Sequence, residues 1–442
     1  MSSATTLKRQ LGFRTAVAFI VGEVIAVGIF LTPSGMAKSL GSPFWLLMVW
    51  LIMGGMAFCG ALCYGELASR FPEAGGGYVY LREAYGRPIA FLYGWMALLV
   101  MDPGLTAALA VGMGSYAGYI FGFSSVAIKS VAIAAIVTIA VVNIRGVKFG
   151  GWLVASLTIL KLGLLFVVIA WGFGMQSGNW SNFQPFFEQR AGSEPLIAAL
   201  AGGLVGAFFS FGGWWDLSKL AGEVRDPERT LPRALLAGVT ILTLVYILTS
   251  AAFIYLVPLE RVTSGEIFVA QAGEAMFGRA GGSVLSTVVI VAVFGSLAAV
   301  VMSAPRVYFA MARNGLFIPA AAALHPRFGT PARAILIQAT LASGLVLLGS
   351  FDTIISYFIF VVVIFIGLTV ASLFVFRRRA TRTSGVALTP AYPLPPVIFL
   401  LLTALILLLL GGRRPLEAIL GVAVVLLGLP VYYFLLREKR SQ

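Results

Sequence analysis

Residues 208–215 of this chain read FFSFGGWW, and this stretch interrupts a long apolar segment at about 196–224. The first apolar segment contains a second interruption, VGEVIAVGIF at 21–30, which is followed by Thr32 and Pro33. Glycine costs a helix about 1 kcal/mol relative to alanine, so paired glycines mark places where a helix can unwind. Within a bilayer, unwound backbone is tolerated only where it is buried in protein or lines a cavity. The two stretches therefore predict two broken helices beside a cavity.

Glycine has a second use in membrane helices, because small residues allow helices to pack closely. The chain has 50 glycines, so close packing alone would also explain two glycine-containing segments. The positions of the two stretches favour broken helices, since interrupted helices at corresponding places in two halves are typical of a transporter binding site. Both interpretations remain open on spacing alone.

Twelve segments of the chain are apolar and long enough to cross a bilayer, which takes about 20 residues. They lie at approximately 15–40, 44–69, 88–119, 126–143, 152–174, 196–224, 233–257, 282–312, 333–350, 353–376, 394–411 and 415–436. The stretches between them are too short for a soluble domain. We therefore predict an all-α integral membrane protein with twelve transmembrane helices and a single membrane domain, residues 1–442.

The composition excludes several classes of protein. Hydrophobic residues make up 60% of the 442 residues and charged residues 11%, whereas soluble domains have roughly 45–50% and about 25%. A soluble enzyme, a disordered protein and a nucleic-acid binder are thereby excluded. Two cysteines, Cys59 and Cys63, and one histidine, His325, are too few for a disulfide framework, a thiolate metal site or a multi-histidine haem site. We expect no cofactor and no metal.

The basic residues indicate how the chain is oriented. The net charge is +14, and most lysines and arginines fall in the loops on the side of the N-terminus, including the run 377–379. Cytoplasmic loops of membrane proteins carry this excess. We therefore predict a multi-pass protein of the plasma or inner membrane with both termini in the cytoplasm.

Two other membrane classes lack their sequence signatures. The chain has no H-E-x-x-H, G-x-G-D or D-D-x-x-D motif, each of which would indicate an intramembrane enzyme. It also has no T-V-G-Y-G filter and no ladder of gating arginines, so an ion channel is disfavoured.

Charged residues inside apolar segments are expensive, at roughly 2.5–3.5 kcal/mol for a helix centre. Lys161 lies near the middle of the fifth segment. Glu23, three residues before the first break, is its natural counterpart, and it can pair with Lys161 or with Lys219. The alternative for Lys161 is a snorkelling side chain with a merely structural partner.

Helical spacing places Asp216, Lys219 and Glu223 on one face of the sixth segment. This face can be an ion-pair network that closes an inner gate, or local salt bridging near the cytoplasmic surface. Asp102, directly before Pro103, has no obvious partner in the sequence. It can bind a cationic substrate group or a proton, or act as a structural cap.

Several blocks of the sequence, in this order and at matching spacing, resemble the amino acid–polyamine–organocation (APC) superfamily and its L-type amino acid transporter branch. The pattern G-x-I-I-G-S-G-I-F resembles residues 22–30, and the patterns A-L-x-Y-A-E-L and S-G-G-x-Y resemble residues 61–67 and 75–78. The patterns Y-G-G-W, E-V-K-N-P and L-P-R-A resemble residues 211–214, 223–227 and 231–234. The eighth helix of the family matches residues 294–297, Arg306 and residues 312–315. The similarity covers nearly the whole chain.

The resemblance implies a LeuT-type fold. Helices 1–5 and 6–10 would form inverted repeats at approximately 13–175 and 196–377, with helices 11 and 12 at approximately 393–436 packed outside. The substrate would sit between the two broken helices. The free N–H groups at the start of the second half of helix 1 would hold a substrate carboxylate.

The resemblance also implies the site residues. The carboxylate would meet the backbone around Ala26, Val27 and Gly28, and the amino group would meet carbonyls near Phe209, Ser210 and Gly212. Phe209 would be an aromatic gate over the substrate. The full set of substrate-binding candidates is Ile25, Ala26, Val27, Gly28, Ile29, Phe209, Ser210, Gly212, Gly213 and Trp215, with Lys161, Glu23 and Lys219 as coupling or structural charges.

The chain departs from the family pattern at the site itself. Ala26 and Val27 replace Gly-Ser, Trp215 stands where relatives often have a small polar residue, and Ala298 stands where some have asparagine. These changes predict a smaller or more apolar cavity, or a substrate other than an ordinary amino acid.

The resemblance implies a secondary transporter of amino acids. A lysine at position 161 would replace a sodium ion beside helix 1, so we expect a sodium-independent exchanger of neutral amino acids. The alternatives are a proton-coupled amino-acid or amine permease and a sodium-coupled symporter. Some relatives bind a heavy subunit through a cysteine in the loop at about 119–127, which has none here. We expect no disulfide-linked heavy subunit, and the sequence leaves the oligomeric state open.

Overall fold

The computed structural model describes residues 7–174, 178–259, 261, 273, 274, 276, 278–348, 351–379, 385–413 and 415–437. The regular structure in these ranges is helical, apart from one bridge between Leu11 and Val224. In chain order the elements are α1 (Phe13–Val24), α2 (Val27–Leu40), α3 (Pro43–Arg70), α4 (Gly77–Tyr85), α5 (Arg87–Met96), η1 (Ala97–Met101), α6 (Asp102–Phe121), α7 (Ser125–Ile144), α8 (Val147–Gly174), η2 (Trp180–Phe183), α9 (Leu196–Phe211), η3 (Trp214–Glu223), α10 (Pro227–Leu256), η5 (Gly278–Ala280), α12 (Gly281–Ser303), α13 (Pro305–Arg313), η6 (Pro319–Ala322), α14 (Ala332–Leu348), α15 (Phe351–Arg378), α16 (Leu394–Arg413), α17 (Pro415–Leu426) and α18 (Gly428–Arg437).

The described helices confirm an all-helical membrane protein. Ten of them, counting contiguous elements as one, are long and apolar enough to cross a membrane, and the bent pair α1–α2 brings the number to eleven. α14 is apolar but has 17 residues. By length, ten or eleven of the twelve predicted spans are therefore found among the described residues. The predicted ninth segment, 333–350, corresponds to α14, and its last two residues, 349 and 350, lie outside the described residues.

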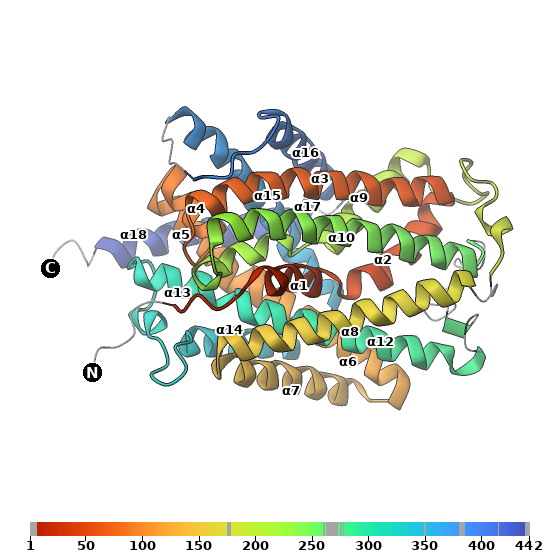
Figure 1. Ribbon diagram of the computed structural model, residues 1–442, viewed down its shortest axis with the longest axis horizontal. Helices are drawn as coiled ribbons and strands as arrows, with labels where there is room; N and C mark the ends of the chain where they lie inside the picture. Colours follow the sequence, from red (N-terminus) through yellow and green to blue (C-terminus); the bar gives the residue numbers. More distant parts are fainter. Residues whose placement is uncertain are drawn as a thin grey trace.

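The long helices run side by side along the longest axis of the molecule (Figure 1). The segment that precedes α1 and the helix α18 lie toward the same end of the bundle (Figure 1). α3 and α10 pack along one another, as do α6 and α12. At the α3–α10 contact, a Cβ on Gly65 would lie 3.1 Å from Pro232 Cβ. Small residues at such contacts allow two helices to approach closely.

A π-helical turn, η1, joins α5 to α6 and ends directly before Asp102 and Pro103. Proline has no N–H and its ring crowds the carbonyl four residues earlier, so a wider turn accommodates it. The continuous span at 87–121 therefore changes pitch where it passes the centre of the bundle.

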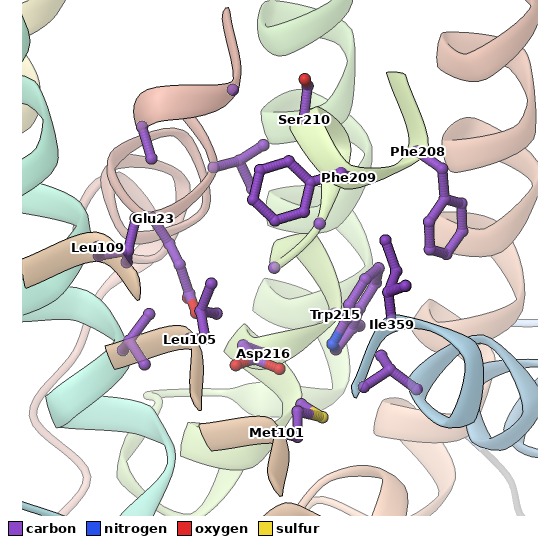
Figure 2. Close-up of a pocket in the computed structure, with 17 residues that line it drawn as sticks. Glu23, Met101, Leu105, Leu109, Phe208, Phe209, Ser210, Trp215, Asp216 and Ile359 are labelled. Carbon is purple, nitrogen blue, oxygen red and sulfur yellow. The ribbon is translucent and has the colours of Figure 1, made fainter. Parts of the chain in front are cut away.

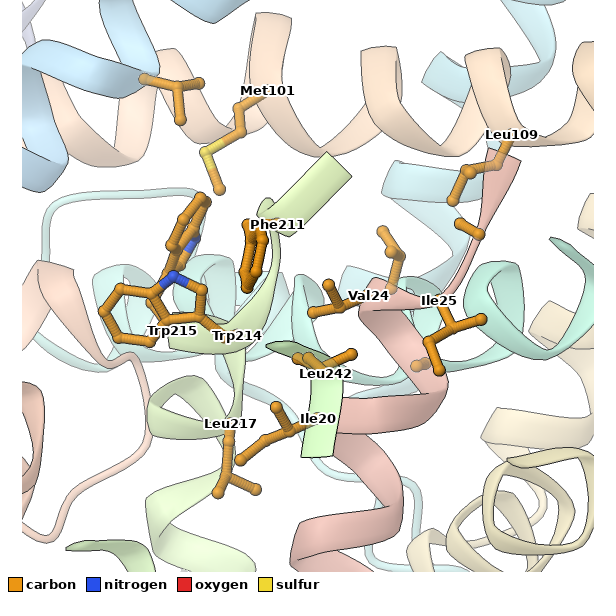
Figure 3. Packing of buried hydrophobic residues seen from close by; sticks show 14 of the residues in the cluster. Ile20, Val24, Ile25, Met101, Leu109, Phe211, Trp214, Trp215, Leu217 and Leu242 are labelled. Atoms are coloured by element: carbon orange, nitrogen blue, oxygen red, sulfur yellow. The ribbon is translucent and has the colours of Figure 1, made fainter. Parts of the chain in front are cut away.

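The centre of the bundle is packed with apolar side chains on both sides of the helix breaks (Figure 3). Ile20 and Ile25 from the first break, and Phe211 and Leu217 from the second, are at most 2% exposed. Trp214 packs edge-on against Tyr64 of α3, with ring centroids 5.2 Å apart. This apolar packing holds the two interrupted segments against their neighbours.

Candidate substrate site at the two broken helices

The first helix breaks where the sequence predicts. α1 ends at Val24 and α2 begins at Val27, and the two halves are bent by 49°. Ile25 and Ala26 leave the helical conformation, with ψ of 86° and −146°. The first N–H groups of α2 consequently have no partner within the helix and form its positive end.

The second break is also confirmed. α9 ends at Phe211, and the chain resumes as the 3₁₀-helix η3 at Trp214. Between them Gly213 has a φ of +109°, a left-handed conformation that favours glycine because a side chain would be strained there. Of the two glycines, Gly213 therefore serves the turn itself.

The two breaks touch each other. A Cβ on Gly28 of α2 would lie 2.8 Å from Ser210 Cα, so only glycine fits at this contact. The hydroxyls of Thr32 and Ser210 are 2.8 Å apart. On the other side the Tyr246 hydroxyl of α10 lies 3.0 Å from the Val24 carbonyl oxygen and 2.7 Å from that of Ser210. One side chain thus links the last turns of both broken helices.

A cavity of about 60 Å³ lies between the two breaks (Figure 2). Its walls come from α1, α2, η1, α6, α9, η3, α12 and α15, and they are mostly apolar. The lining residues are Glu23, Val24, Ala26, Gly28, Met101, Leu105, Leu109, Phe208, Phe209, Ser210, Gly212, Gly213, Trp215, Asp216, Val300, Ile359 and Val362. Phe209 and Trp215 project into it from opposite sides of the second break (Figure 2).

Most of the site residues expected from the sequence line this cavity. Ala26, Gly28 and Glu23 do so from the first break, and Phe209, Ser210, Gly212, Gly213 and Trp215 do so from the second. Ile25 and Ile29 do not, because both side chains are buried in the apolar core. The Val27 side chain lies outside the described part of the chain.

Lys161 of α8 lies behind the first break and is fully buried. Its ammonium donates to the carbonyl oxygens of Gly22 (2.7 Å), Ile25 (2.8 Å) and Ala292 (2.7 Å). The Ser296 hydroxyl of α12 lies 3.2 Å away and reaches the Gly22 and Ile25 carbonyls as well. The expected pair with Glu23 is not formed between these described residues, since neutral oxygens surround the ammonium.

Lys219 also has partners other than Glu23. Its ammonium lies 2.9 Å from Asp102 Oδ1 of α6 and 2.8 Å from Asp216 Oδ2, and all three side chains are 1% exposed. In a 3₁₀-helix residues three apart eclipse, which brings Asp216 directly over Lys219. Tyr308 of α13 donates to the other Asp102 oxygen at 3.0 Å. Asp102 therefore has a partner 117 residues away.

Glu223 belongs to a separate contact. It forms two hydrogen bonds of 3.0 Å with the Arg306 guanidinium of α13. Its carbonyl accepts from the N–H groups of Gln10 and Leu11, and the N–H of Arg225 donates back to Leu11 at 2.8 Å. The single charged face predicted for 216–223 is thus divided: its start faces the cavity, and its end fastens the segment before α1.

The comparisons with known proteins agree with this architecture. The amino acid permease family matches residues 11–422. The chain belongs to the amino acid permease family. It is similar to the serine/threonine exchanger SteT of Bacillus subtilis (strain 168), with 32% identity over 438 residues that cover 98% of both chains. It is also similar to two human proteins.

The human large neutral amino acids transporter small subunit 2 is 29% identical over 450 residues, covering 97% of this chain and 80% of that protein. The human cystine/glutamate transporter is 27% identical over 444 residues, covering 99% of this chain and 87% of that protein. This amino acid permease is accordingly a membrane transporter and not an enzyme, and it belongs to the superfamily that the sequence motifs resemble.

Sequence reasoning did not select several residues that build the site of the permease. Tyr246, Ser296 and Tyr308 each place a hydroxyl on the backbone or on a carboxylate of the site. Their only signal in the sequence is a polar atom within an apolar helix, which many residues share. The apolar wall from Met101, Leu105 and Leu109 has no sequence signal, because it depends on which face of α6 turns inward.

The chemistry of the cavity follows from its polar groups. The α2 N-terminus offers N–H donors to an anion, and the carboxyl groups of Glu23 and Asp216 offer acceptors to a cation. The carbonyls of Phe209 and Ser210 already accept from the Gly212 N–H and the Tyr246 hydroxyl, although each keeps a second lone pair. Among the described residues no group of three His, Cys, Asp or Glu side chains is arranged for a metal ion.

Proposed function

We propose that this permease carries small neutral amino acids across the membrane by alternating access, without sodium and by exchange. The observation that carries the proposal is the cavity itself, which lies between two helix breaks. The α2 N-terminus would hold the substrate carboxylate, and the acceptors on the opposite side would hold its ammonium group. A zwitterion supplies both charges, whereas an amine or a carboxylic acid alone supplies one.

The size of the cavity limits the side chain of the substrate. A free volume of about 60 Å³ accommodates only a few water-sized groups. Trp215 and Phe209 both line this cavity, so their rings would limit a longer side chain. The names of the relatives include an exchanger of serine and threonine, which are amino acids of this size.

The surroundings of Lys161 support independence from sodium. A sodium ion in this place would need the oxygens of Gly22, Ile25, Ala292 and Ser296 as ligands. The ammonium uses all four, and it brings a fixed positive charge in place of the ion. A sodium-coupled symporter is therefore disfavoured.

The finer architecture is part of the same proposal. We infer twelve spans, with α14 as the ninth, in a LeuT-type arrangement of inverted repeats at approximately 13–175 and 196–377 and two outer helices at 393–436. The broken helices would then be the first of each repeat. Both ends of the chain would be cytoplasmic, and the common location of the segment before α1 and of α18 supports this (Figure 1).

The permease is proposed to reside in the plasma or inner membrane and to need no disulfide-linked subunit. Its two cysteines, Cys59 and Cys63, both lie within the helix α3 and not in the loop at 119–127. A partner that binds without a disulfide is compatible with this arrangement.

The test is uptake of radiolabelled amino acids by the purified permease in liposomes. We expect serine, threonine or alanine to enter vesicles loaded with unlabelled amino acid, equally well in sodium and in choline. Absence of uptake for every amino acid would contradict the substrate class, and strict sodium dependence would contradict the role given to Lys161.

A pair of tryptophan variants tests the site. Trp215→Ala should admit larger neutral amino acids such as leucine, because it enlarges the cavity. Trp152→Ala, at a side chain of α8 that is 63% exposed, should leave selectivity unchanged. Equal selectivity in both variants would place the substrate elsewhere.

A further inference from the structure

Two acidic side chains in the cavity have oxygens without a hydrogen-bond donor. Glu23 is 3% exposed and Asp216 is 1% exposed. Neither carboxyl oxygen of Glu23 has a donor among the described residues, and Asp216 Oδ1 has none either. A buried polar group without a partner is costly, so each such atom calls for an occupant.

The Glu23 carboxyl group lies against the second break, because a Cβ on Gly213 would lie 3.6 Å from Glu23 Oε1. Asp216 follows three residues after Gly213, and the two carboxyl groups line one cavity. Both are on the same side of the cavity (Figure 2). Two carboxylates buried in one small cavity repel each other, because like charges interact strongly in a medium of low dielectric constant. A single proton shared between them removes the repulsion and supplies the missing donor.

The charges around the pair also indicate one additional proton. Three buried carboxyl groups, those of Glu23, Asp102 and Asp216, face two ammonium groups, those of Lys161 and Lys219. One positive charge is therefore missing from the cluster. The titratable and charged side chains that face the pair are Lys161 from α8, Lys219 from η3, Asp102 from α6, Tyr308 from α13, Tyr93 from α5 and Tyr64 from α3.

The existing cations cannot supply that charge. The Lys161 ammonium is held by three carbonyl oxygens and the Ser296 hydroxyl. The Lys219 ammonium is shared between Asp102 and Asp216 Oδ2, which leaves Asp216 Oδ1 and both Glu23 oxygens for a third cation.

We propose that Glu23 and Asp216 form a cation subsite that holds one shared proton in the substrate-free permease and the ammonium group of the amino acid in the loaded one. This inference rests on the proposed function, because it assigns the substrate ammonium to a specific pair of side chains. When the ammonium binds, its N–H groups donate to the carboxylates and the shared proton leaves for the solvent. The permease then returns across the membrane with either a second amino acid or a proton.

The subsite makes the direction of the pH effect definite. Acid favours the shared proton and therefore competes with the amino acid, so affinity falls as pH falls, by up to about tenfold per pH unit for one proton. Acid inside the vesicles, on the side opposite to the added amino acid, should increase the rate of uptake. It accelerates the return step and supports uptake into vesicles that contain no amino acid.

The direct test is calorimetric titration of the purified permease with L-serine, L-threonine and L-alanine in buffers of different ionisation enthalpy. Release of up to about one proton for each amino acid bound is expected. In Glu23→Gln, binding should weaken and proton release should vanish. Glu188→Gln, an exposed carboxyl group before α9, is the matched control and should release protons as the native protein does.

Asp216→Asn is the second variant, and it should also abolish proton release. The test therefore does not depend on whether the Glu23→Gln variant folds. Binding of an amino acid without proton release would overturn the subsite and leave the proposed function intact. Absence of binding by any amino acid would overturn both. Proton release caused by sodium chloride alone, with choline chloride as the reference, would show a site for metal cations and would also overturn the proposal.

Discussion

The two helix breaks that bound the cavity have similar backbones and different charges. At the first break, the free carbonyls of Gly22 and Ile25 are occupied by the Lys161 ammonium from a neighbouring helix. At the second, the chain continues as a 3₁₀-helix that carries its own Asp216 and Lys219. The first break is thus fixed by one cation on neutral oxygens, and the second by ion pairs.

This difference indicates that the two breaks bind different charged groups of the substrate. The Gly22 and Ile25 carbonyls of the first break are occupied by Lys161, so the backbone group that remains available there is the positive end of α2. Two carboxyl groups lie beside the second break: that of Asp216 from η3, and that of Glu23, which comes from α1 and lies against Gly213. They are only partly neutralised, so they remain available to a cation. Four single substitutions and one double variant would break or sharpen this comparison.

The largest effect is expected for Lys219→Met. The substitution leaves Asp102 and Asp216 buried without their shared cation, and breaking such a pair costs about 3–5 kcal/mol of folding free energy. Thermal unfolding in detergent should show a large drop in melting temperature. Lys148→Met, at an exposed residue of α8, should melt like the native protein.

A double variant makes that prediction specific. Adding Asp102→Asn to Lys219→Met removes one of the two stranded charges and should recover part of the lost stability, since the residues interact directly. No recovery would mean that lost packing, and not the ion pair, accounts for the effect.

Lys161→Met should reduce transport strongly, and its effect on transport should exceed its effect on folding. The variant leaves three buried carbonyl oxygens without their donor, and uptake should fall on the order of 100-fold, equivalent to about 3 kcal/mol. Initial rates of uptake measure it, with the exposed Lys38→Met as the control. Undiminished uptake would show that the first break does not depend on this ammonium.

Gly28→Ala tests the contact between the breaks. The new Cβ would meet the backbone of Ser210 at 2.8 Å, which cannot move aside as a side chain would. Overpacking of this kind costs about 1–3 kcal/mol, and we expect uptake to fall by about tenfold. Gly35→Ala lies in the same helix with no atom within 4 Å and should transport normally. Equal activity of the two variants would rule out a functional contact.

Tyr246→Phe should have the smallest effect. It removes the hydroxyl that joins Val24 to Ser210, a hydrogen bond worth about 1 kcal/mol. The KM for the amino acid should rise a few-fold because the two breaks are less firmly joined. Tyr433→Phe, at an exposed ring of α18, serves as the control. An unchanged KM would mean that packing alone aligns the breaks.

The elements that the sequence predicted well are those with local signals. Long apolar runs mark the spans, and the glycines at 212–213 mark a real break because Gly213 adopts a left-handed conformation there. These signals need no knowledge of which helices are neighbours. The position of Lys161 beside the first break was predicted from the resemblance to the family and not from a local signal.

The pairing of charges was not predictable from the sequence. Lys219 is 117 residues from Asp102, and Glu223 is 83 residues from Arg306. Only the packing of the helices brings these residues together. The prediction of one charged face on 216–223 was wrong because it assumed an α-helix, whereas η3 is a 3₁₀-helix with a different period.

The central claim is that the two breaks hold the two ends of one amino acid. An experimental structure of the permease with bound L-serine tests it most directly. The account predicts the carboxylate at the N–H groups of Val27 and Gly28 and the ammonium group within hydrogen-bonding distance of Glu23. An amino acid bound outside this cavity, or bound with its carboxylate toward Glu23, would contradict it.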